Sequence, residues 1–391
     1  MKKLKKLLLL ILFSAALSGC GGALISKTTP PVLVPEPTEP KQHVVLSIYA
    51  AGDIMAHAPQ QASALQKYGS YDFNENYQYV KPIIEQADIA ICNIEMTFAG
   101  KPYAGYPRFS APDEIAAAVK NAGFDIAVTA NNHAFDNGAA GVKRTIEVLT
   151  SAGFQTTGTF ASPDDKKYLL VSVKGVIVAI ISATFESGNI NGNIAINGIA
   201  ITKDSAKLIN SFFGQDIKKY EDLISQAKKE GAEIVICYFH WGTEYQTLPE
   251  QAQKDIALKL AAAGADIIFG SHPHMIQGFE VLKLKDKQIP VYYSLGNFIS
   301  NQRKELMGQS LSENGIIAQV NLTFDTENKK IIEISSNYTP TWVDKYFQNG
   351  RYVYQIVPLI GDFKNNPPIP ASGRQNQAEQ ALKDIKKIID K

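Results

Sequence analysis

Residues 266–274 read Asp-Ile-Ile-Phe-Gly-Ser-His-Pro-His, so two histidines closely follow a short apolar run. A run of this length and composition is typical of a buried strand. Three further histidines follow comparable runs: His57 after residues 44–51, His133 after residues 125–130 and His240 after residues 233–239. In an open α/β sheet, residues beyond the carboxyl ends of several strands can line one crevice. The sequence therefore predicts that five of its six histidines are neighbours in space, and only His43 lies elsewhere.

Strand-like and helix-like segments alternate from His43 to about residue 299, which predicts a layered α/β protein. We expect strands near residues 44–51, 88–94, 125–130, 168–174, 176–183, 233–239, 266–270, 279–284 and 290–295. We expect helices near residues 76–87, 112–122, 138–152, 217–230 and 250–263. Glycines follow four of these helices, at 123, 153, 231 and 264, where a left-handed residue readily ends a helix.

Other segments fall outside this alternation. Residues 188–198, rich in Gly, Asn and Ile, are expected to form a surface excursion, and residues 301–314 a long loop. Residues 315–325 and 329–340 have the pattern of two hairpin strands. Residues 379–391 carry apolar residues at helical spacing, which predicts a terminal helix packed on the body. We place the main domain at residues 43–345 and a C-terminal extension at residues 346–391.

Composition places the chain among folded proteins. Its 391 residues are 45% hydrophobic and 20% charged, which excludes global disorder and a multi-span membrane protein. Removal of residues 1–19 would take away four lysines and no acidic residue, changing the formal net charge from +1 to −3. A nucleic-acid partner is not expected, because binding a polyanion needs clustered positive charge and no long basic stripe is present.

The first twenty residues have the pattern of a bacterial lipoprotein signal. Four lysines precede the apolar run from Leu7 to Leu17, and Leu17-Ser18-Gly19-Cys20 closes it. The run is short for a membrane span, which favours an export signal over residues 1–19 against an uncleaved anchor helix. The mature chain would begin at Cys20, lipidated on its thiol, and continue as a proline-rich tether over residues 20–42. We therefore expect a lipoprotein anchored to the cell membrane, with its domain outside the cytoplasm.

The two remaining cysteines, Cys92 and Cys237, both lie inside apolar strand-like runs. Free cysteine behaves in such runs as a small hydrophobic residue. Buried thiols are therefore the leading interpretation. A disulfide stays open as the alternative, because the chain is exported and a sequence does not supply the separation of the two Cα atoms.

The polar residues that follow the predicted strands point to metal binding. They are Asp53, His57, Asn93, Glu95, Asn131, Asn132, His133, His240, His272 and His274. Neutral imidazole and carboxylate are the ligands that zinc, manganese and iron prefer, and a shared carboxylate can bridge two ions. Any one of these residues could instead cap a turn or bond to the backbone. Burying all of them without ions or partners would be costly, which favours a metal site.

Six ordered motifs resemble those of the calcineurin-like metallophosphoesterase superfamily, and more closely those of its poly-gamma-glutamate capsule-synthesis branch, the CapA-type proteins. The resemblance covers about residues 45–300. The motifs are Gly-Asp-Ile-Met (52–55), Asn-Ile-Glu (93–95), Ala-Asn-Asn-His-Ala-Phe-Asp (130–136), His-Trp-Gly-Thr-Glu-Tyr (240–245), Gly-Ser-His-Pro-His (270–274) and Ser-Leu-Gly-Asn-Phe (294–298). The resemblance implies a layered αββα sandwich of the metallophosphoesterase type with mixed sheets.

Carried over residue by residue, the resemblance implies two divalent metal ions, of Mn, Zn or Fe. One ion would be held by Asp53, His57 and His274, the other by Asn132, His240 and His272, and Glu95 would bridge them. His133 would be the general acid that protonates the leaving group, with Asp136 as its orienting partner.

This chain departs from the superfamily pattern at two positions. The usual first motif is Asp-x-His, whereas here it is Asp53-x-x-x-His57, so His57 is the least secure ligand. The second motif usually supplies aspartate, whereas Glu95 reaches one methylene farther. We expect the spacing or the identity of the metal ions to differ accordingly.

Four residues are candidates for substrate binding. Arg108, in a loop before a helix, could clamp a carboxylate or a phosphate, and an ordinary surface arginine is an equally good interpretation. Glu244 and Tyr245 follow His240 and could line the rim of the pocket. Asn297 could contact the substrate or support a ligand.

The resemblance implies a role in poly-gamma-glutamate capsule or related surface-polymer biosynthesis. The implied chemistry is a metal-dependent hydrolase that cleaves phosphoester or gamma-glutamyl bonds with a metal-bridging hydroxide. The alternatives are a non-catalytic, metal-containing factor that binds or assembles the polymer, and a phosphoesterase unrelated to capsule. The expected partners are an anionic polymer or a phosphorylated substrate, and membrane subunits for polymer synthesis.

Overall fold

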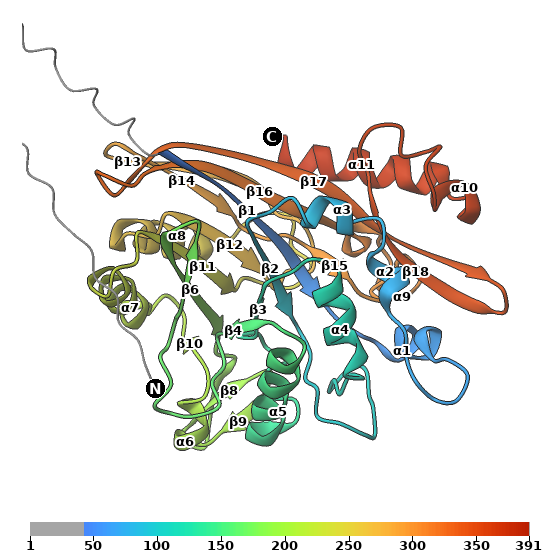
Figure 1. Cartoon of the computed structure of the whole chain (residues 1–391). Coiled ribbons are helices and arrows are strands. Elements are labelled where there is room, and N and C mark those ends of the chain that lie inside the picture. The colour runs from blue at the N-terminus through green and yellow to red at the C-terminus, as the bar shows by residue number, and fades with distance from the viewer. Residues whose placement is uncertain (1–42, 391) are drawn as a thin grey trace, which may run out of the picture. The chain divides into compact units, whose positions relative to one another are not determined.

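The computed structural model describes residues 43–390, and their strands form three sheets (Figure 1). The expected signal peptide, the tether and the lipid-attachment residue Cys20 lie outside the described residues. Across residues 43–390, no helix combines the length and the apolar character needed to cross a membrane.

The first sheet is mixed and is built around β1. Its strands, in spatial order, are β18 (Arg351–Pro358), β17 (Lys330–Gln348), β16 (Asn314–Asp325), β1 (His43–Ile54), β2 (Ile89–Ile94), β3 (Ile126–Val128) and β4 (Gln155–Thr157). β1 to β4 run parallel, whereas β16, β17 and β18 are antiparallel to their neighbours. β15 (Asn297–Ile299) pairs with the end of β1, beyond the point where β16 stops pairing. The last residues of β1 are therefore held from both sides.

The second sheet is also mixed. Its strands, in spatial order, are β10 (Ser211–Phe212), β6 (Val176–Phe185), β11 (Ile234–His240), β12 (Ile267–Ser271), β14 (Lys287–Tyr292) and β13 (Phe279–Leu284), with β5 (Leu169–Val173) paired to β6. β5 and β13 are antiparallel to their neighbours, and the others run parallel. A third, antiparallel sheet contains β7 (Gly188–Ile190), β8 (Asn193–Ile196) and β9 (Ile199–Ile201).

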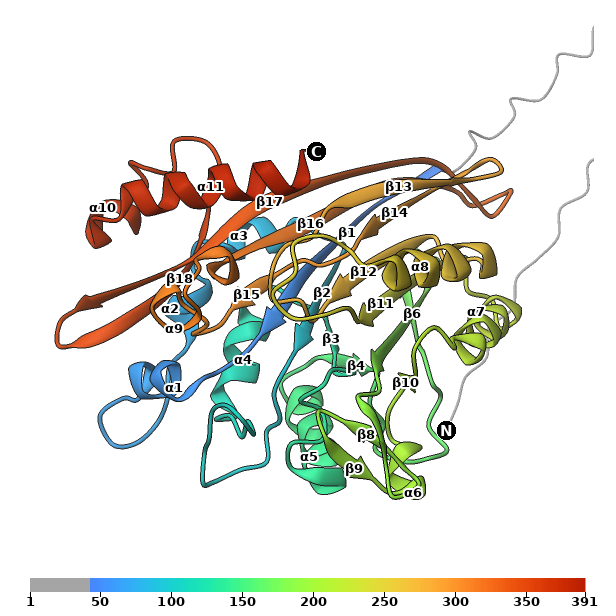
Figure 2. The same cartoon turned by 180° about the vertical axis from the view of Figure 1, so that it is seen from behind.

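The first two sheets pack face to face. Alternate residues of a strand point to opposite faces, and Leu46 and Ile48 of β1 share one buried cluster with Val178 and Ile180 of β6. The outer face of the first sheet is covered by α1 (Ala58–Ala64), α2 (Asn74–Tyr77), α3 (Lys81–Ile84), α4 (Glu114–Asn121) and α5 (Gly138–Ser151). The outer face of the second is covered by α7 (Lys218–Lys229) and α8 (Gln251–Ala263) (Figure 2). The layers confirm the expected αββα arrangement with mixed sheets.

The C-terminal part is built into the first sheet. The expected boundary at residue 345 falls inside β17, which runs from Lys330 to Gln348. α11 (Gln375–Ile389) lies along β17 and adds Ala381 and Ile385 to the cluster between the sheets (Figure 1). The remaining short elements are α6 (Lys203–Ala206), α9 (Lys304–Met307), a 3-10 turn (Leu311–Glu313) and α10 (Ile369–Ser372).

Most expected elements are confirmed, and the exceptions have local causes. The helix expected over residues 76–87 is two short helices, because Pro82 in the first turn of α3 lacks the N–H that a continuous helix would need. The excursion expected over residues 188–198 is part of the third sheet. The strand expected at 290–295 ends at Tyr292, where it pairs with Phe279 of β13. β4, β10, β15 and β18 were not predicted, and three of them have only two or three residues.

Cys92 and Cys237 are free and buried, which confirms the leading interpretation. Cys92 belongs to the cluster on the outer face of the first sheet, and Cys237 to the cluster on the outer face of the second. Two stacked sheets lie about 10 Å apart, whereas a disulfide needs Cα atoms within about 7 Å. The disulfide alternative is therefore wrong. Burial raises the pKa of both thiols.

Gly52, in β1 next to Asp53, is closely packed against backbone. A Cβ atom at this position would lie 1.9 Å from the carbonyl oxygen of Gly296. Backbone moves less readily than a side chain, so Gly52→Ala is expected to destabilise the protein by about 2–3 kcal/mol in chemical denaturation. Gly278→Ala is the control, because its Cβ would meet nothing closer than 3.9 Å, and its effect should stay within about 1 kcal/mol. Equal losses in the two variants would contradict this packing.

Candidate metal centre

Polar side chains stand at the carboxyl ends of strands from both sheets. In the first sheet, Asp53 of β1 pairs in register with Asn93 of β2, and Glu95 directly follows β2. In the second sheet, His240 ends β11 and pairs in register with Ser271, which ends β12. Because the two sheets stack face to face, these strand ends meet.

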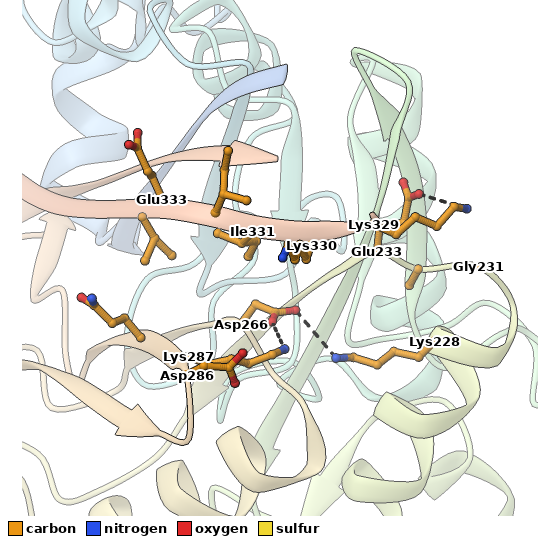
Figure 3. A pocket seen from close by; sticks show the side chains of 14 residues that line it. Lys228, Gly231, Glu233, Asp266, Asp286, Lys287, Lys329, Lys330, Ile331 and Glu333 are labelled. Carbon is orange, nitrogen blue, oxygen red and sulfur yellow. Dashed lines mark hydrogen bonds and ion pairs between the residues drawn. The ribbon is translucent and has the colours of Figure 1, made fainter. Parts of the chain in front are cut away.

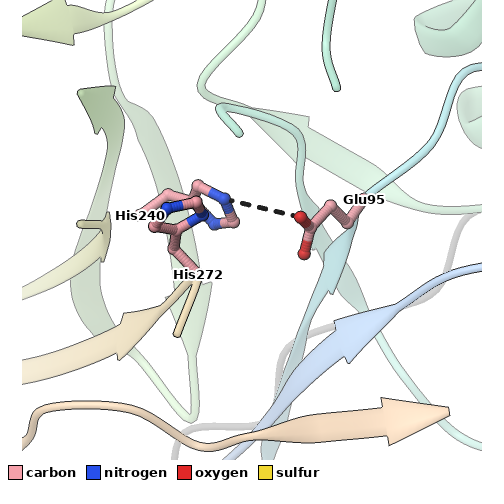
Figure 4. Close-up of side chains that lie close together, drawn as sticks. All are labelled: Glu95, His240 and His272. Atoms are coloured by element: carbon pink, nitrogen blue, oxygen red, sulfur yellow. Dashed lines mark ion pairs between the residues drawn. The ribbon is translucent and has the colours of Figure 1, made fainter. Parts of the chain in front are cut away.

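Two groups of three buried residues share Glu95. One consists of Asp53, Glu95 and His274, and the other of Glu95, His240 and His272. Within each group the candidate ligand atoms lie within 4.8 Å of one another. Figure 4 shows the rings of His240 and His272 side by side, across from the Glu95 carboxylate. These buried groups could hold metal ions.

Individual distances show how closely the side chains converge. His240 Nε2 lies 2.8 Å from Asn132 Oδ1 and 3.6 Å from Glu95 Oε1. His274 Nε2 lies 3.8 Å from the same oxygen of Glu95, and His274 Nδ1 lies 3.0 Å from Asp53 Oδ2. Asn132 therefore joins the group that contains His240, and Glu95 Oε1 is the point where the two groups meet.

Two buried atoms at the centre of this site lack partners. Among residues 43–390, neither Glu95 Oε1 nor His272 Nδ1 has a hydrogen-bond partner. Leaving buried polar atoms unpaired is costly, and a divalent cation between them would remove that cost. Carboxylate, amide and imidazole donors suit zinc, manganese and iron. The residues present therefore fit metal ions.

Burial shifts the protonation of the candidate ligands. Burial, and then the charge of Asp53, raise the pKa of Glu95 well above its usual value. Burial would also raise the pKa of Asp53, but the hydrogen bond to His274 and its charge outweigh it and lower that pKa. Burial lowers the pKa of His240 well below its usual value and that of His272 to about 3. Both imidazoles are therefore neutral, which is the form that binds metals.

Three polar residues support the candidate ligands. Asn93 Nδ2 donates to Asp53 Oδ1 at 2.8 Å, and Asn93 Oδ1 accepts from Asn131 Nδ2 at 3.0 Å. Ser271 Oγ lies 2.8 Å from His240 Nδ1 and so orients that ring. Ser271 was not among the expected site residues, and its one signal in the sequence is its place inside the Gly-Ser-His-Pro-His motif.

The backbone of that motif is strained. His272 has φ of 99° and His274 has φ of 57°, in a region that non-glycine residues rarely adopt. Such strain persists only where the surrounding structure enforces it, and it clusters at functional sites. The turn after β12 therefore directs both imidazoles into the site at a cost in backbone energy.

His133 and Asp136 form a buried pair beside the two groups. His133 Nδ1 lies 2.8 Å from Asp136 Oδ2, and the same carboxylate oxygen accepts the backbone N–H of Phe109 at 2.7 Å. The Phe109 ring meets the His133 ring edge-on, with 4.7 Å between their centroids. The carboxylate and the phenyl ring together leave the imidazole with one orientation, in which Nε2 has no hydrogen-bond partner among residues 43–390.

His57 stands beside both groups and belongs to neither. It precedes α1, and its Nδ1 is 3.2 Å from Gln60 Oε1 and accepts the backbone N–H of Asn301 at 3.3 Å. Burial lowers the pKa of His57 to about 4. The Phe109 ring also contacts this imidazole edge-on, with 5.2 Å between the centroids.

The four expected substrate-binding residues have different surroundings. Arg108 is exposed and Glu244 is partly buried. The Tyr245 ring lies 6.0 Å from that of His274. Asn297 is buried in β15 next to Asp53, and its amide nitrogen donates to Gln302 Oε1 and to the carbonyl of Ser312, so it holds the following loop.

Phe185 packs against two candidate ligands, and it was not among the site residues expected from the sequence. It ends β6, and its ring lies 4.6 Å from that of His272 and is stacked at 6.4 Å on that of His240. An apolar residue at a strand end carries no chemical signal in the sequence. Only the stacking of β6 beside β11 identifies its role.

A cavity of about 620 Å³ lies at the amino-terminal ends of β11 and β12, whereas the candidate metal centre lies at their carboxyl ends (Figure 3). It is lined by Glu233 and Asp266, which precede β11 and β12. Asp266 is 2.9 Å from Lys287 Nζ, and Glu233 is 3.3 Å from Lys329 Nζ. These carboxylates are thus neutralised by lysines, and none of the candidate ligands lines this cavity.

Comparison with known proteins found a matching family model and similar proteins. A family model described as bacterial capsule synthesis protein PGA_cap matches residues 47–302. The capsule biosynthesis protein CapA of Bacillus anthracis is 31% identical over 362 residues, which cover 90% of this chain and 76% of that protein. The PGA biosynthesis protein CapA of Bacillus subtilis (strain 168) is 31% identical over 269 residues, covering 66% of this chain and 64% of that protein.

Two solved structures resemble the fold more distantly. A hypothetical protein from Thermus thermophilus has a TM-score of 0.43 and 15% identity, covering 75% of this chain and 99% of that one. A phosphatase from Mycoplasma pneumoniae has a TM-score of 0.42 and 14% identity, covering 76% of this chain and 95% of that one.

Proposed function

Because this chain belongs to the bacterial capsule synthesis family PGA_cap, we propose that it acts in the biosynthesis of a poly-gamma-glutamate capsule or a related surface polymer. The 31% identity to the B. anthracis CapA protein over most of both chains supports this role. As its biochemical activity we propose a metal-dependent hydrolysis at a centre of two ions.

The sharing of Glu95 between two ligand groups carries the proposal of two ions. Asp53 and His274 would hold one ion, Asn132, His240 and His272 the other, and Glu95 would contact both. A single ion would leave one of these groups of buried polar atoms unsatisfied, which is costly. The donor set admits Mn, Zn or Fe.

The residues around the ions supply the remaining chemistry. Two divalent ions, when bound, would provide Lewis acidity and an activated water at neutral pH. Asp136 holds His133 Nδ1, so His133 Nε2 is the atom that can deliver a proton to the leaving group. The bond cleaved would be a phosphoester or a gamma-glutamyl bond, and Arg108 would meet the anionic part of the substrate.

We place the protein outside the cytoplasm, anchored to the membrane by lipid on Cys20. The lysine-rich start, the short apolar run and Leu17-Ser18-Gly19-Cys20 support this location. The anionic polymer or a phosphorylated substrate, and membrane subunits for polymer synthesis, would then be the partners.

Metal analysis of matched variants tests the activity. The purified protein is expected to hold about two divalent ions, and Asp53→Ala and His272→Ala are expected to lose them. His133→Ala is expected to keep the ions and to lose about 10²- to 10⁴-fold in the turnover of a phosphoester or gamma-glutamyl substrate. Plasma mass spectrometry counts the ions, and product release measures turnover.

Two outcomes would reject the proposed activity. A parent protein without metal would remove the centre, and unchanged turnover in His133→Ala would remove the proposed acid. An intact metal centre without turnover of either substrate would leave the polymer-binding or assembly role in its place. Unchanged surface polymer after deletion of the gene would reject the capsule role itself.

A further inference from the structure

One phenyl ring separates two imidazoles beside the metal site. The ring of Phe109 meets His57 at 5.2 Å and His133 at 4.7 Å, edge-on in both cases. His57 is partly exposed, whereas the residues of the two ligand groups are buried. His57 is therefore accessible to a molecule that arrives from solvent.

The partners of His133 fix where its proton lies. A carboxylate oxygen of Asp136 is 2.8 Å from His133 Nδ1, and a carboxylate only accepts hydrogen bonds. Nδ1 therefore carries a proton, and Nε2 of the neutral ring has a lone pair. This nitrogen can pick up a proton and pass it on.

In His57, by contrast, the hydrogen-bond partner of Nδ1 is a donor. The backbone N–H of Asn301 donates to His57 Nδ1 at 3.3 Å, which requires a lone pair on that nitrogen. Among the described residues, this amide reaches no other acceptor. A proton on Nδ1 would leave a buried N–H unpaired, which is an expensive loss.

Gln60 does not reverse this preference. Its Nε2 donates to the carbonyl of Met55 at 3.0 Å, which turns its Oε1 toward His57. That oxygen lies 3.2 Å from His57 Nδ1, but it already accepts the backbone N–H of His57 at 2.9 Å. Gln60 Oε1 stays satisfied without a proton on Nδ1, and the Asn301 amide is satisfied only in that state, so the proton of the neutral ring belongs on Nε2.

We propose that His57 is a fixed Nε2–H donor that binds an oxygen of the anionic substrate, and not a metal ligand. A metal ligand needs a lone pair on the coordinating nitrogen, and the Asn301 contact takes the lone pair at Nδ1. His57 and His133 would then contact the substrate in opposite tautomers, one holding an oxyanion and the other moving a proton. This inference rests on the proposed metal-dependent function and assigns the expected ligand His57 a different role.

The tautomer can be read directly in the full chain loaded with Zn²⁺, which is diamagnetic. Two-bond ¹H–¹⁵N spectra of protein labelled at histidine distinguish an Nε2–H ring from an Nδ1–H ring. We expect Nε2–H for His57 and Nδ1–H for His133. An Nδ1–H ring at His57 would overturn the proposal, and this measurement is independent of any enzymatic activity.

A matched pair of variants tests the donor. His57→Gln places an amide N–H₂ near the position of Nε2, whereas His57→Leu has no donor. We expect both variants to bind as much metal as the parent. Affinity for inorganic phosphate or for gamma-glutamylglutamate, measured by calorimetry, is expected to fall about 10- to 100-fold in His57→Leu and to be largely kept in His57→Gln.

The outcomes separate this inference from the proposed function. Weakening of either probe in His57→Leu alone supports the donor, and the probe affected identifies the oxyanion as phosphate or carboxylate. Loss of about one metal ion in His57→Leu would make His57 a ligand and overturn the inference. Equal weakening in both variants, or none in either, would also overturn it. A parent protein without metal would instead reject the proposed function.

Discussion

Glu95→Gln is expected to abolish most metal binding, because it removes the carboxylate that both ligand groups share. Glu95 belongs to both groups, and its Oε1 lies 3.6 Å from His240 Nε2 and 3.8 Å from His274 Nε2. The amide that replaces it has almost the same shape but lacks the negative charge that two adjacent cations require. Both sites should therefore weaken together in mass spectrometric metal analysis.

Once the metal is removed, Glu95→Gln should instead stabilise the protein at alkaline pH. Burial, and then the charge of Asp53, raise the pKa of Glu95, so the folded state holds this proton to a higher pH than the unfolded state does. Such a group stabilises the fold only while it is protonated, and that stability is lost as pH rises through the folded pKa. The slope is at most about 1.4 kcal/mol per pH unit for one proton.

Denaturation with and without chelator provides the comparison. In chelator, Glu95→Gln should be more stable than the parent at alkaline pH, and the difference should shrink as pH falls toward the usual range of a carboxyl group. With saturating metal the order should reverse, because only the parent gains from binding. Glu85→Gln, an exposed residue outside both ligand groups, is the control and should show neither effect. The same order of stability in both conditions would contradict a bridging role for Glu95.

Arg303→Ala is expected to destabilise the protein strongly, although Arg303 lies outside the metal site. The Arg303 side chain is 1% exposed, and its Nη2 donates to Glu313 Oε2 at 2.8 Å. Its Nη1 donates to the carbonyl of Val343 at 2.5 Å. Truncation would leave Glu313 buried without its cation, which costs about 3–5 kcal/mol. The free energy of unfolding in urea or guanidinium measures the loss.

Two further variants show whether the loss comes from the buried charge. Removing both charges in Arg303→Met with Glu313→Leu should recover much of the stability, because apolar residues of similar volume can replace a buried ion pair. Lys207→Ala removes one partner of an exposed pair with Asp204 and should change stability by less than about 1 kcal/mol. A loss in the double variant as large as in Arg303→Ala would show that packing, and not charge, is responsible.

The fold could be predicted from the sequence because its signals are local. The alternation of apolar runs such as residues 233–239 with amphipathic segments such as 250–263 reflects the periods of strand and helix, and both elements are where they were expected. Gly264, expected to end α8, has φ of 115°. Very short strands such as β10, with two residues, carry too little pattern to be recognised and form only because a neighbouring strand is present.

The sequence predicted that histidines would gather at the strand ends, but it did not predict the individual contacts around them. Histidines at strand ends predicted a shared crevice, and His240, His272 and His274 do lie together. The burial of Arg303 had no signal, since arginine is normally exposed and its partner Glu313 lies in a segment expected to be a loop. Phe185 likewise had no signal, because its role depends on which strands are neighbours.

By itself, the sequence determined the layered fold, the family and the residue types available to bind metal, because strand period and motif order are properties of the local chain. Only the tertiary structure decided which atoms meet. Asp53 and His274 are 221 residues apart and lie within 3.0 Å, whereas His57, only four residues from Asp53, stands outside both ligand groups. The stacking of two sheets and the positive φ of His272 and His274 set these distances, and neither is encoded in a local pattern.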